Sequence, residues 1–182
     1  MLIMNKLLLF FLSLMSGISF AQELSSAQKK EWKTELQKME KSDQYYRVKM
    51  AKNPALNNDS IWKLQSDIDS INKATFVELT TKYGYPTMGR VRYAGTIGMI
   101  LHFTLEEDFI QLKELFYSEL KKGNMPPKEY AWWYDRCQRN MHQPIYFGQY
   151  TNEKFCGDQL KLFNERRKEI GLEELVGNLN CI

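Results

Sequence analysis

His102 is the residue with the clearest capacity for proton chemistry. It is one of two histidines in the chain and lies at the end of its most hydrophobic stretch after the N-terminus, residues 91–103. A histidine beside a carboxylate can act as a general acid or base near neutral pH. Asp135 is a candidate carboxylate because it follows the aromatic run Trp132-Trp133-Tyr134. We therefore take His102 and Asp135 as candidate catalytic residues.

Asp43 and Arg47 form a second irregularity, on an expected amphipathic helix. Asp43 stands where the apolar stripe of that helix requires another apolar residue, and Arg47 follows four residues later on the same face. A carboxylate on an apolar face costs stability unless it is paired. The stripe consists of Trp32, Leu36, Met39, Tyr46 and Met50.

Three further arginines, Arg136, Arg166 and Arg167, lie in helices that also carry core aromatics. Arginine can hold a carboxylate or phosphate with two hydrogen bonds. Together with Asp43 and Arg47 they are candidate binding residues for a polar or anionic small molecule. The alternative is a structural network, since helical domains also bury Asp–Arg pairs as ties between helices.

Several classes of function are excluded by what the sequence lacks. It has no glycine-rich phosphate loop, no Gly-x-Ser-x-Gly nucleophile motif and no His-Glu-x-x-His zinc motif. Two histidines are too few for a histidine-rich metal centre, whereas a site built from carboxylates stays open because Asp and Glu are common in the chain. We predict no metal and no cofactor. The net charge of +3 is too even for nucleic-acid binding or a polybasic membrane anchor.

Residues 1–21 have the pattern of a secretory signal peptide. Lys6 precedes an apolar run at 7–14, and Ser19-Phe20-Ala21 places small residues at the two positions that a signal peptidase reads. The run is too short for a permanent span, and no cysteine follows it to accept a lipid. The sequence predicts an exported, periplasmic or secreted protein with no stable membrane span after cleavage.

The three cysteines, Cys137, Cys156 and Cys181, allow at most one intrachain disulfide. A bridge from Cys137 to Cys156 would join a helix to the loop after it. Cys137 as a catalytic thiol is the alternative.

Helical periodicity and capping signals predict a single all-α domain over residues 22–182, with about six helices. The third, residues 89–103, is expected to be one buried helix with Ala94, Gly98 and His102 on one face. The second is expected to bury the stripe Ile61, Leu64, Ile68, Ile71 and Leu79. Residues 141–151 are expected to be irregular, with a short β-hairpin near Tyr146 to Tyr150 as one option. The expected helices cover residues 25–51, 59–83, 89–103, 104–122, 126–140 and 158–171, with a loop over residues 52–58.

Short motifs in this order resemble an uncharacterised bacterial domain-of-unknown-function family, over about residues 30–175. The resemblance implies a shared fold and a shared polar cluster, and it implies no activity. The motifs are Asp43-Gln44-x-x-Arg47, Asp69-x-x-Asn72, Gly84-Tyr85-Pro86, His102, Asp135-Arg136, the loop from Tyr146 to Gln149, and Arg166-Arg167-x-x-x-Gly171-Leu172.

Three hypotheses follow for the function. The first is an exported domain that binds a polar or anionic small molecule. The second is a hydrolase-like enzyme that uses His102 or Asp135 as general acid or base. The third is a structural or protein-interaction module in which the polar cluster only ties helices together.

Overall fold

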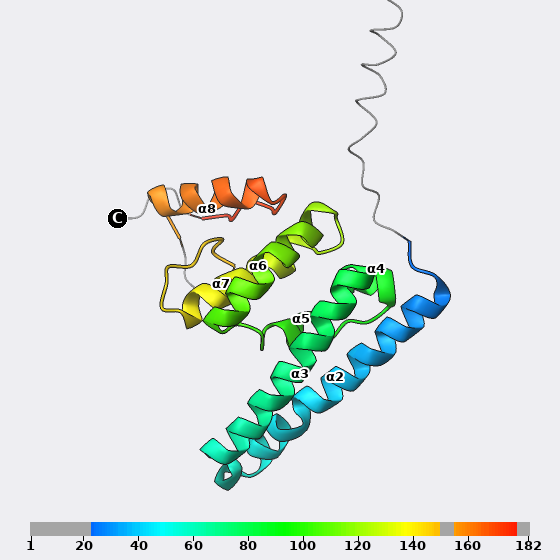
Figure 1. Cartoon of the computed structure of the whole chain (residues 1–182). Helices are drawn as coiled ribbons and strands as arrows, with labels where there is room; N and C mark the ends of the chain where they lie inside the picture. The colour runs from blue at the N-terminus through cyan, green and yellow to red at the C-terminus, as the bar shows by residue number, and fades with distance from the viewer. Residues whose placement is uncertain (1–22, 150–154, 178–182) are drawn as a thin grey trace, which may run out of the picture.

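A computed structural model describes residues 23–149 and 155–177, and these residues form an all-α fold as predicted. They contain seven α-helices and one 3-10 helix, with no β-strand. In Figure 1 the two longest helices, α2 and α3, form an antiparallel hairpin whose tip projects beyond the other helices. The elements are α2 (Ser26–Lys52), η1 (Pro54–Leu56), α3 (Asp59–Tyr83), α4 (Met88–Val91), α5 (Thr96–Ile100), α6 (Glu106–Lys121), α7 (Pro127–Asn140) and α8 (Gly157–Glu169).

The hairpin begins and ends where the sequence has capping residues. The spacing Ser25-x-x-Gln28 predicts a capping box, and the structure has one at the start of α2. The sequence also suggests Asp59 or Ser60 as the cap of α3, but Asn58 caps it instead, through the N–H of Ile61. Gly84 ends α3 with a φ of +80°, a left-handed conformation that favours glycine. A Cβ there would lie 2.8 Å from Asn124 Nδ2, so the close packing also requires glycine.

The buried face of α3 differs from the predicted stripe. Leu64 is 43% exposed and Ile71 is 67% exposed, whereas Gln65 and Asn72 are buried. The reason lies in α2, which presents polar groups to α3: Asn72 donates to the carbonyl of Met39 at 3.2 Å. Polar residues of α3 therefore face α2, and part of its apolar stripe faces outward.

The single helix predicted over residues 89–103 is wrong. The structure has two short helices, α4 and α5, separated at Arg92, whose φ is +53°. Val91 and Tyr93 are both buried. Residues two apart lie about 200° apart around a straight helix, so one helix could not bury both against the same core. The break also places His102 in a turn after α5 rather than on a helix face.

The core is dominated by aromatic side chains from α2, α3, α6 and α7, packed around Phe76. Trp133 contacts Phe116 edge-on, with ring centroids 4.7 Å apart, and donates its indole N–H to the carbonyl of Phe103. A smaller apolar cluster of Phe155, Leu160 and Phe163 packs under α8.

Cys137 is a buried free thiol, so the expected bridge between Cys137 and Cys156 is wrong. Cys156 is nevertheless disulfide-bonded. The expected signal peptide at 1–21, Tyr150 of the expected hairpin and Cys181 lie outside the described residues. None of the helices in the described ranges is long and apolar enough to cross a membrane.

Candidate functional site

The predicted site residues fall into two separate groups. We call the first the Asp43 cluster; it joins α2, α3 and the turn after α5. We call the second the Asp135 clamp; it joins α7, the loop at 146–149 and α8. The Asp43 cluster consists of Asp43, Arg47, Gln65, Asp69 and His102, and the Asp135 clamp of Asp135, Tyr146, Phe147, Gln149 and Arg167.

Asp43 is the centre of its cluster and is 3% exposed. Its Oδ1 lies 2.8 Å from His102 Nδ1 and accepts a hydrogen bond from Arg47 Nη1 at 2.8 Å. Its Oδ2 accepts from Gln44 Nε2 at 2.5 Å. Asp43 and Arg47 meet because they lie four residues apart on α2, whereas His102 is brought to them by the break between α4 and α5.

Arg47 links Asp43 to α3. Its guanidinium donates to both oxygens of Asp69, at 3.0 Å and 2.7 Å, in the two-pronged geometry that arginine forms with carboxylates. Gln65, four residues earlier on α3, donates to Asp69 Oδ1 at 2.8 Å. The positive charge of Arg47 is therefore shared by two carboxylates, which leaves the cluster with one excess negative charge when His102 is neutral.

A cavity of about 230 Å³ opens beside this cluster, between α3 and the segment that leads from His102 into α6. Its polar lining includes Asp69, Lys73, Glu107 and Asp108, and Trp62 and His102 also border it. Lys73 and Asp108 form an ion pair across the cavity wall, and Asp108 also accepts from the N–H of Leu105 at the start of α6. The spacing Thr104-x-x-Glu107 predicts a capping box that starts at Thr104, but the helix cap forms one residue later, at Leu105 with Asp108.

His102 connects the cluster to the cavity. With Nδ1 held by the Asp43 carboxylate, the neutral ring carries its proton on Nδ1 and leaves Nε2 as an acceptor. Nε2 makes no hydrogen bond to any residue in the described ranges, and 23% of the side chain is exposed. The arrangement orients the ring so that Nε2 can accept a hydrogen bond or a proton from a molecule in the cavity.

The Asp135 clamp has a different construction. Asp135 is fully buried, and its carboxylate accepts backbone N–H hydrogen bonds from Tyr146 and Phe147 at 2.8 Å each and from Gln149 at 2.6 Å. These three donors point inward from an irregular loop, which has no strand partner to satisfy them. The carboxylate therefore accepts the hydrogen bonds that backbone carbonyls of a helix or sheet would otherwise accept from these amides.

Arg166 and Arg167 complete this second group from α8. Arg167 donates to the carbonyl of Phe147 and to the side chain of Gln149, each at 3.1 Å. Burial lowers the pKa of the Arg167 guanidinium, and the nearby Asp135 carboxylate opposes that shift. Arg166 lies over the ring of Tyr146, 3.9 Å from its centroid. Both arginines hold the loop.

The structure thus brings Asp43, Arg47 and His102 together and places Asp135, Arg166 and Arg167 elsewhere. Arg136 is half-buried on α7 and does not line the cavity. The sequence motif Asp69-x-x-Asn72 contained one residue of the cluster, but Lys73 and Asp108 carried no sequence signal that separated them from ordinary surface charges.

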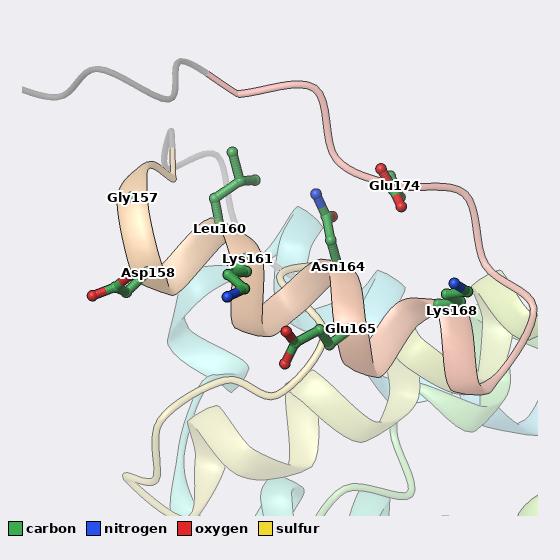
Figure 2. Close-up of a pocket in the computed structure, with 8 residues that line it drawn as sticks. All are labelled: Gly157, Asp158, Leu160, Lys161, Asn164, Glu165, Lys168 and Glu174. Carbon is green, nitrogen blue, oxygen red and sulfur yellow. The ribbon is translucent and has the colours of Figure 1, made fainter.

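A wider groove of about 520 Å³ runs along α8 and carries charges of both signs. Figure 2 shows Asn164 pointing from α8 toward the segment that carries Glu174. Asn164 exchanges two hydrogen bonds with the backbone of Leu175 in that segment. The groove is thus the seam between α8 and the chain that follows it, and neither a histidine nor a buried carboxylate is among the residues that line it.

The thiol of Cys137 is a poor candidate nucleophile, because burial raises its pKa far above the usual range. Among the residues that the structure describes, no group of three or more His, Cys, Asp or Glu side chains could hold a metal ion. No protein-family model, no curated protein and no solved structure matches the chain.

Proposed function

We propose that the protein binds a small polar molecule in the cavity beside the Asp43 cluster and contacts it through His102 Nε2. The observation that carries the proposal is the 2.8 Å contact between Asp43 Oδ1 and His102 Nδ1 at the wall of a cavity. It orients the ring and leaves one nitrogen for a ligand. If His102 only linked the helices, its second ring nitrogen, Nε2, would not need to lie beside a cavity.

The charges around the cavity favour an uncharged or cationic ligand over an anionic one. Three carboxylates, Asp69, Glu107 and Asp108, line it against the single ammonium group of Lys73. The arginines that could attract an anion are engaged: Arg47 with Asp43 and Asp69, and Arg166 and Arg167 with the loop of the Asp135 clamp. Trp62, 48% exposed at the rim, offers an aromatic face to a cation or a sugar.

The second candidate function is acid–base catalysis of the hydrolase type on the same ligand. It is favoured by the carboxylate–imidazole pair, in which Asp43 supports His102. Asp135, the other general acid or base that the sequence suggested, lies in the Asp135 clamp and takes no part. In this role His102 accepts a proton from a water molecule or a hydroxyl group that attacks the bound molecule. Binding is the common requirement of both functions, so it is tested first.

The chain has two histidines, which makes a direct test simple. In a proton NMR spectrum the imidazole signals of His102 and His142 are assigned with the variants His102→Asn and His142→Asn. Ethanolamine, glycinamide and N-acetylglucosamine are titrated separately, with acetate and phosphate as anionic comparisons. We expect at least one of the first three to shift the His102 signal in a saturable manner and to leave exposed His142 unchanged.

No movement of the His102 signal with any of the five compounds counts against the site. A response to acetate or phosphate alone contradicts the preference for uncharged and cationic ligands. Equal shifts at both histidines indicate a solvent effect and also count against binding in the cavity.

We also propose that the protein acts outside the cytoplasm, after removal of residues 1–21. The disulfide at Cys156 supports this proposal, because such bonds persist mainly in oxidising compartments. Expression of the full-length chain in bacteria, followed by fractionation and N-terminal sequencing, should yield periplasmic or extracellular protein that begins at Gln22. Full-length protein retained in the cytoplasm contradicts the proposal.

A further inference from the structure

Trp62 borders two spaces on the surface of the protein. One is the cavity beside the Asp43 cluster, and the other is a groove of about 360 Å³. The groove lies where α2 ends and α3 begins, at the projecting tip of the hairpin (Figure 1). We call it the tip groove; it is lined by Arg47, Met50, Ala51, Pro54, Asn57 and Trp62.

The tip groove is apolar in character. Met50, Ala51 and Pro54 line it with carbon atoms, and its two polar residues already have partners within the protein. Asn57 Oδ1 accepts the indole N–H of Trp62 at 2.6 Å, and Arg47 is held by two carboxylates. The hydrogen bond satisfies the one polar atom of the indole. Trp62 therefore offers carbon surface to any molecule that enters the groove.

The cavity and the tip groove are neighbours that share one lining residue. Trp62 borders both, and the Arg47–Asp69 ion pair has one partner in the lining of each. Helix α2 sets the distance between them, because Asp43 holds His102 at one end and Ala51 lines the groove at the other. These two positions are eight residues apart, or about 12 Å along the helix. A single extended molecule can span that distance.

The cavity end of such a molecule meets one carboxylate that has no partner within the described residues. Asp69 is paired with Arg47, and Asp108 is paired with Lys73. Glu107 also lines the cavity, and it takes part in none of the ion pairs of the described chain. A positively charged head group would therefore find a free carboxylate there.

From the shared Trp62 and the different lining of the two spaces, we infer that the ligand is a primary amine with an aliphatic chain. The ammonium group lies in the cavity near Glu107 and His102, and the chain passes Trp62 into the tip groove. This inference rests on the proposed function, since it names the class of ligand for the same site. It adds a second requirement, namely that the apolar part of the ligand contributes to affinity.

The alternative explanation is that the tip groove is only the hollow left by the turn between α2 and α3. A hollow of that kind would bind nothing, and a longer chain on the ligand would remain in water. The two explanations differ in one measurable quantity, the dependence of affinity on chain length.

The first test titrates propylamine, hexylamine and octylamine into protein purified after expression of the full-length chain. Proton NMR follows the imidazole signal of His102 and the indole N–H signal of Trp62, which the variant Trp62→Phe assigns. We expect hexylamine to bind at least about tenfold more tightly than propylamine, because each fully buried methylene group increases affinity about three- to fourfold. Both signals should move with the same dissociation constant.

The second test changes the tip groove and leaves the cavity intact. Ala51→Gln extends a polar side chain into the groove from an exposed position at the end of α2. It should remove most of the advantage of hexylamine and leave the dissociation constant of propylamine unchanged. Glutamine adds no charge, so any effect on the ammonium group through electrostatic attraction is avoided.

Ala74→Gln is the matched control. Ala74 is also exposed on the hairpin, but it lines neither the cavity nor the tip groove. Its variant should bind propylamine and hexylamine as the wild type does. Circular dichroism confirms that both variants remain folded, which these exposed positions should permit.

Three results overturn the inference. Equal affinities for propylamine and hexylamine show that the chain is not bound, and they leave the proposed function standing if the His102 signal still responds. Equal losses of hexylamine affinity in Ala51→Gln and Ala74→Gln show that the chain lies outside the tip groove. No response of His102 to any amine, together with no response to the five compounds named above, removes the proposed function as well.

Discussion

Asp43 and Asp135 are two buried aspartates with different partners. Asp43, 3% exposed, is held by the side chains of Arg47, Gln44 and His102. Asp135, fully buried, is held by three backbone amides of the loop at 146–149. Both residues interrupt apolar sequence and both are engaged, but their surroundings differ. Asp43 orients a histidine at a cavity, whereas the pocket beside the Asp135 clamp is bordered by Gln149 and Arg167 and has no histidine in its lining.

The two aspartates differ in the hydrogen-bond donors that hold them: backbone amides for Asp135 and side chains for Asp43. Backbone amides are fixed by the path of the chain, so Asp135 cannot change its partners without releasing the loop. Side-chain donors can move, and the imidazole can pass a proton onward while its carboxylate partner stays in place. A buried carboxylate held by backbone amides is therefore structural, and one that orients a histidine at a cavity is a candidate for chemistry.

The largest effect is expected from Asp135→Asn. The amide has one acceptor oxygen and places an NH₂ group against donors that already point inward. Because hydrogen bonds to a charged acceptor contribute about 1.5–3 kcal/mol each, we expect a loss of about 3–5 kcal/mol in the free energy of unfolding. Urea denaturation measures it.

The control for Asp135→Asn is Glu165→Gln, an exposed position on α8, which should change stability by less than about 0.5 kcal/mol. If Asp135→Asn is as mild as its control, the loop does not depend on the carboxylate. The claim that Asp135 has a structural role would then be wrong.

A smaller loss is expected from Asp43→Asn. Arg47 keeps both hydrogen bonds to Asp69, and the asparagine oxygen can still accept one hydrogen bond from Arg47 or His102. We expect a loss of about 1–3 kcal/mol in the free energy of unfolding, together with a changed imidazole signal for His102 in the proton NMR spectrum. An unchanged His102 signal would show that Asp43 does not orient the ring in solution.

The sequence predicted the helical fold, the capping box that begins α2 and the glycine that ends α3, because capping residues and glycine stops are local signals. It placed the cap of α3 at Asp59 or Ser60, one or two residues after the Asn58 that forms it. It also predicted that Asp43 and Arg47 meet, since they lie four residues apart on one helix. It did not predict the buried face of α3. The period of Ile61, Leu64, Ile68 and Ile71 defines a stripe but does not say which neighbour covers it, and α2 buries Gln65 and Asn72 instead.

The different roles of Asp43 and Asp135 also could not be predicted from the sequence. Asp43 and His102 are 59 residues apart, and the chain between them breaks at Arg92, whose left-handed conformation non-glycine residues seldom adopt. Three donors to Asp135 are backbone amides, and every residue other than proline has one. No side-chain pattern could therefore indicate that this aspartate, rather than Asp43, would hold a loop.

The smallest effect on stability and the largest on ligand binding are expected from His102→Asn. Asparagine keeps an N–H group that can donate to Asp43, and the ring is 23% exposed, so the free energy of unfolding should fall by less than about 1 kcal/mol. The side chain is too short to present a second nitrogen to the cavity. Any compound that shifts the His102 signal of the wild type, and stabilises it against heat, should therefore raise the melting temperature of the variant much less than that of the wild type.

The control for His102→Asn is His142→Asn, at an exposed position after α7, which should retain the full response to the ligand. A His102→Asn protein that is destabilised as strongly as Asp135→Asn would place His102 among the structural ties. Both aspartates would then be structural, and they would differ only in the segments of the chain that they connect.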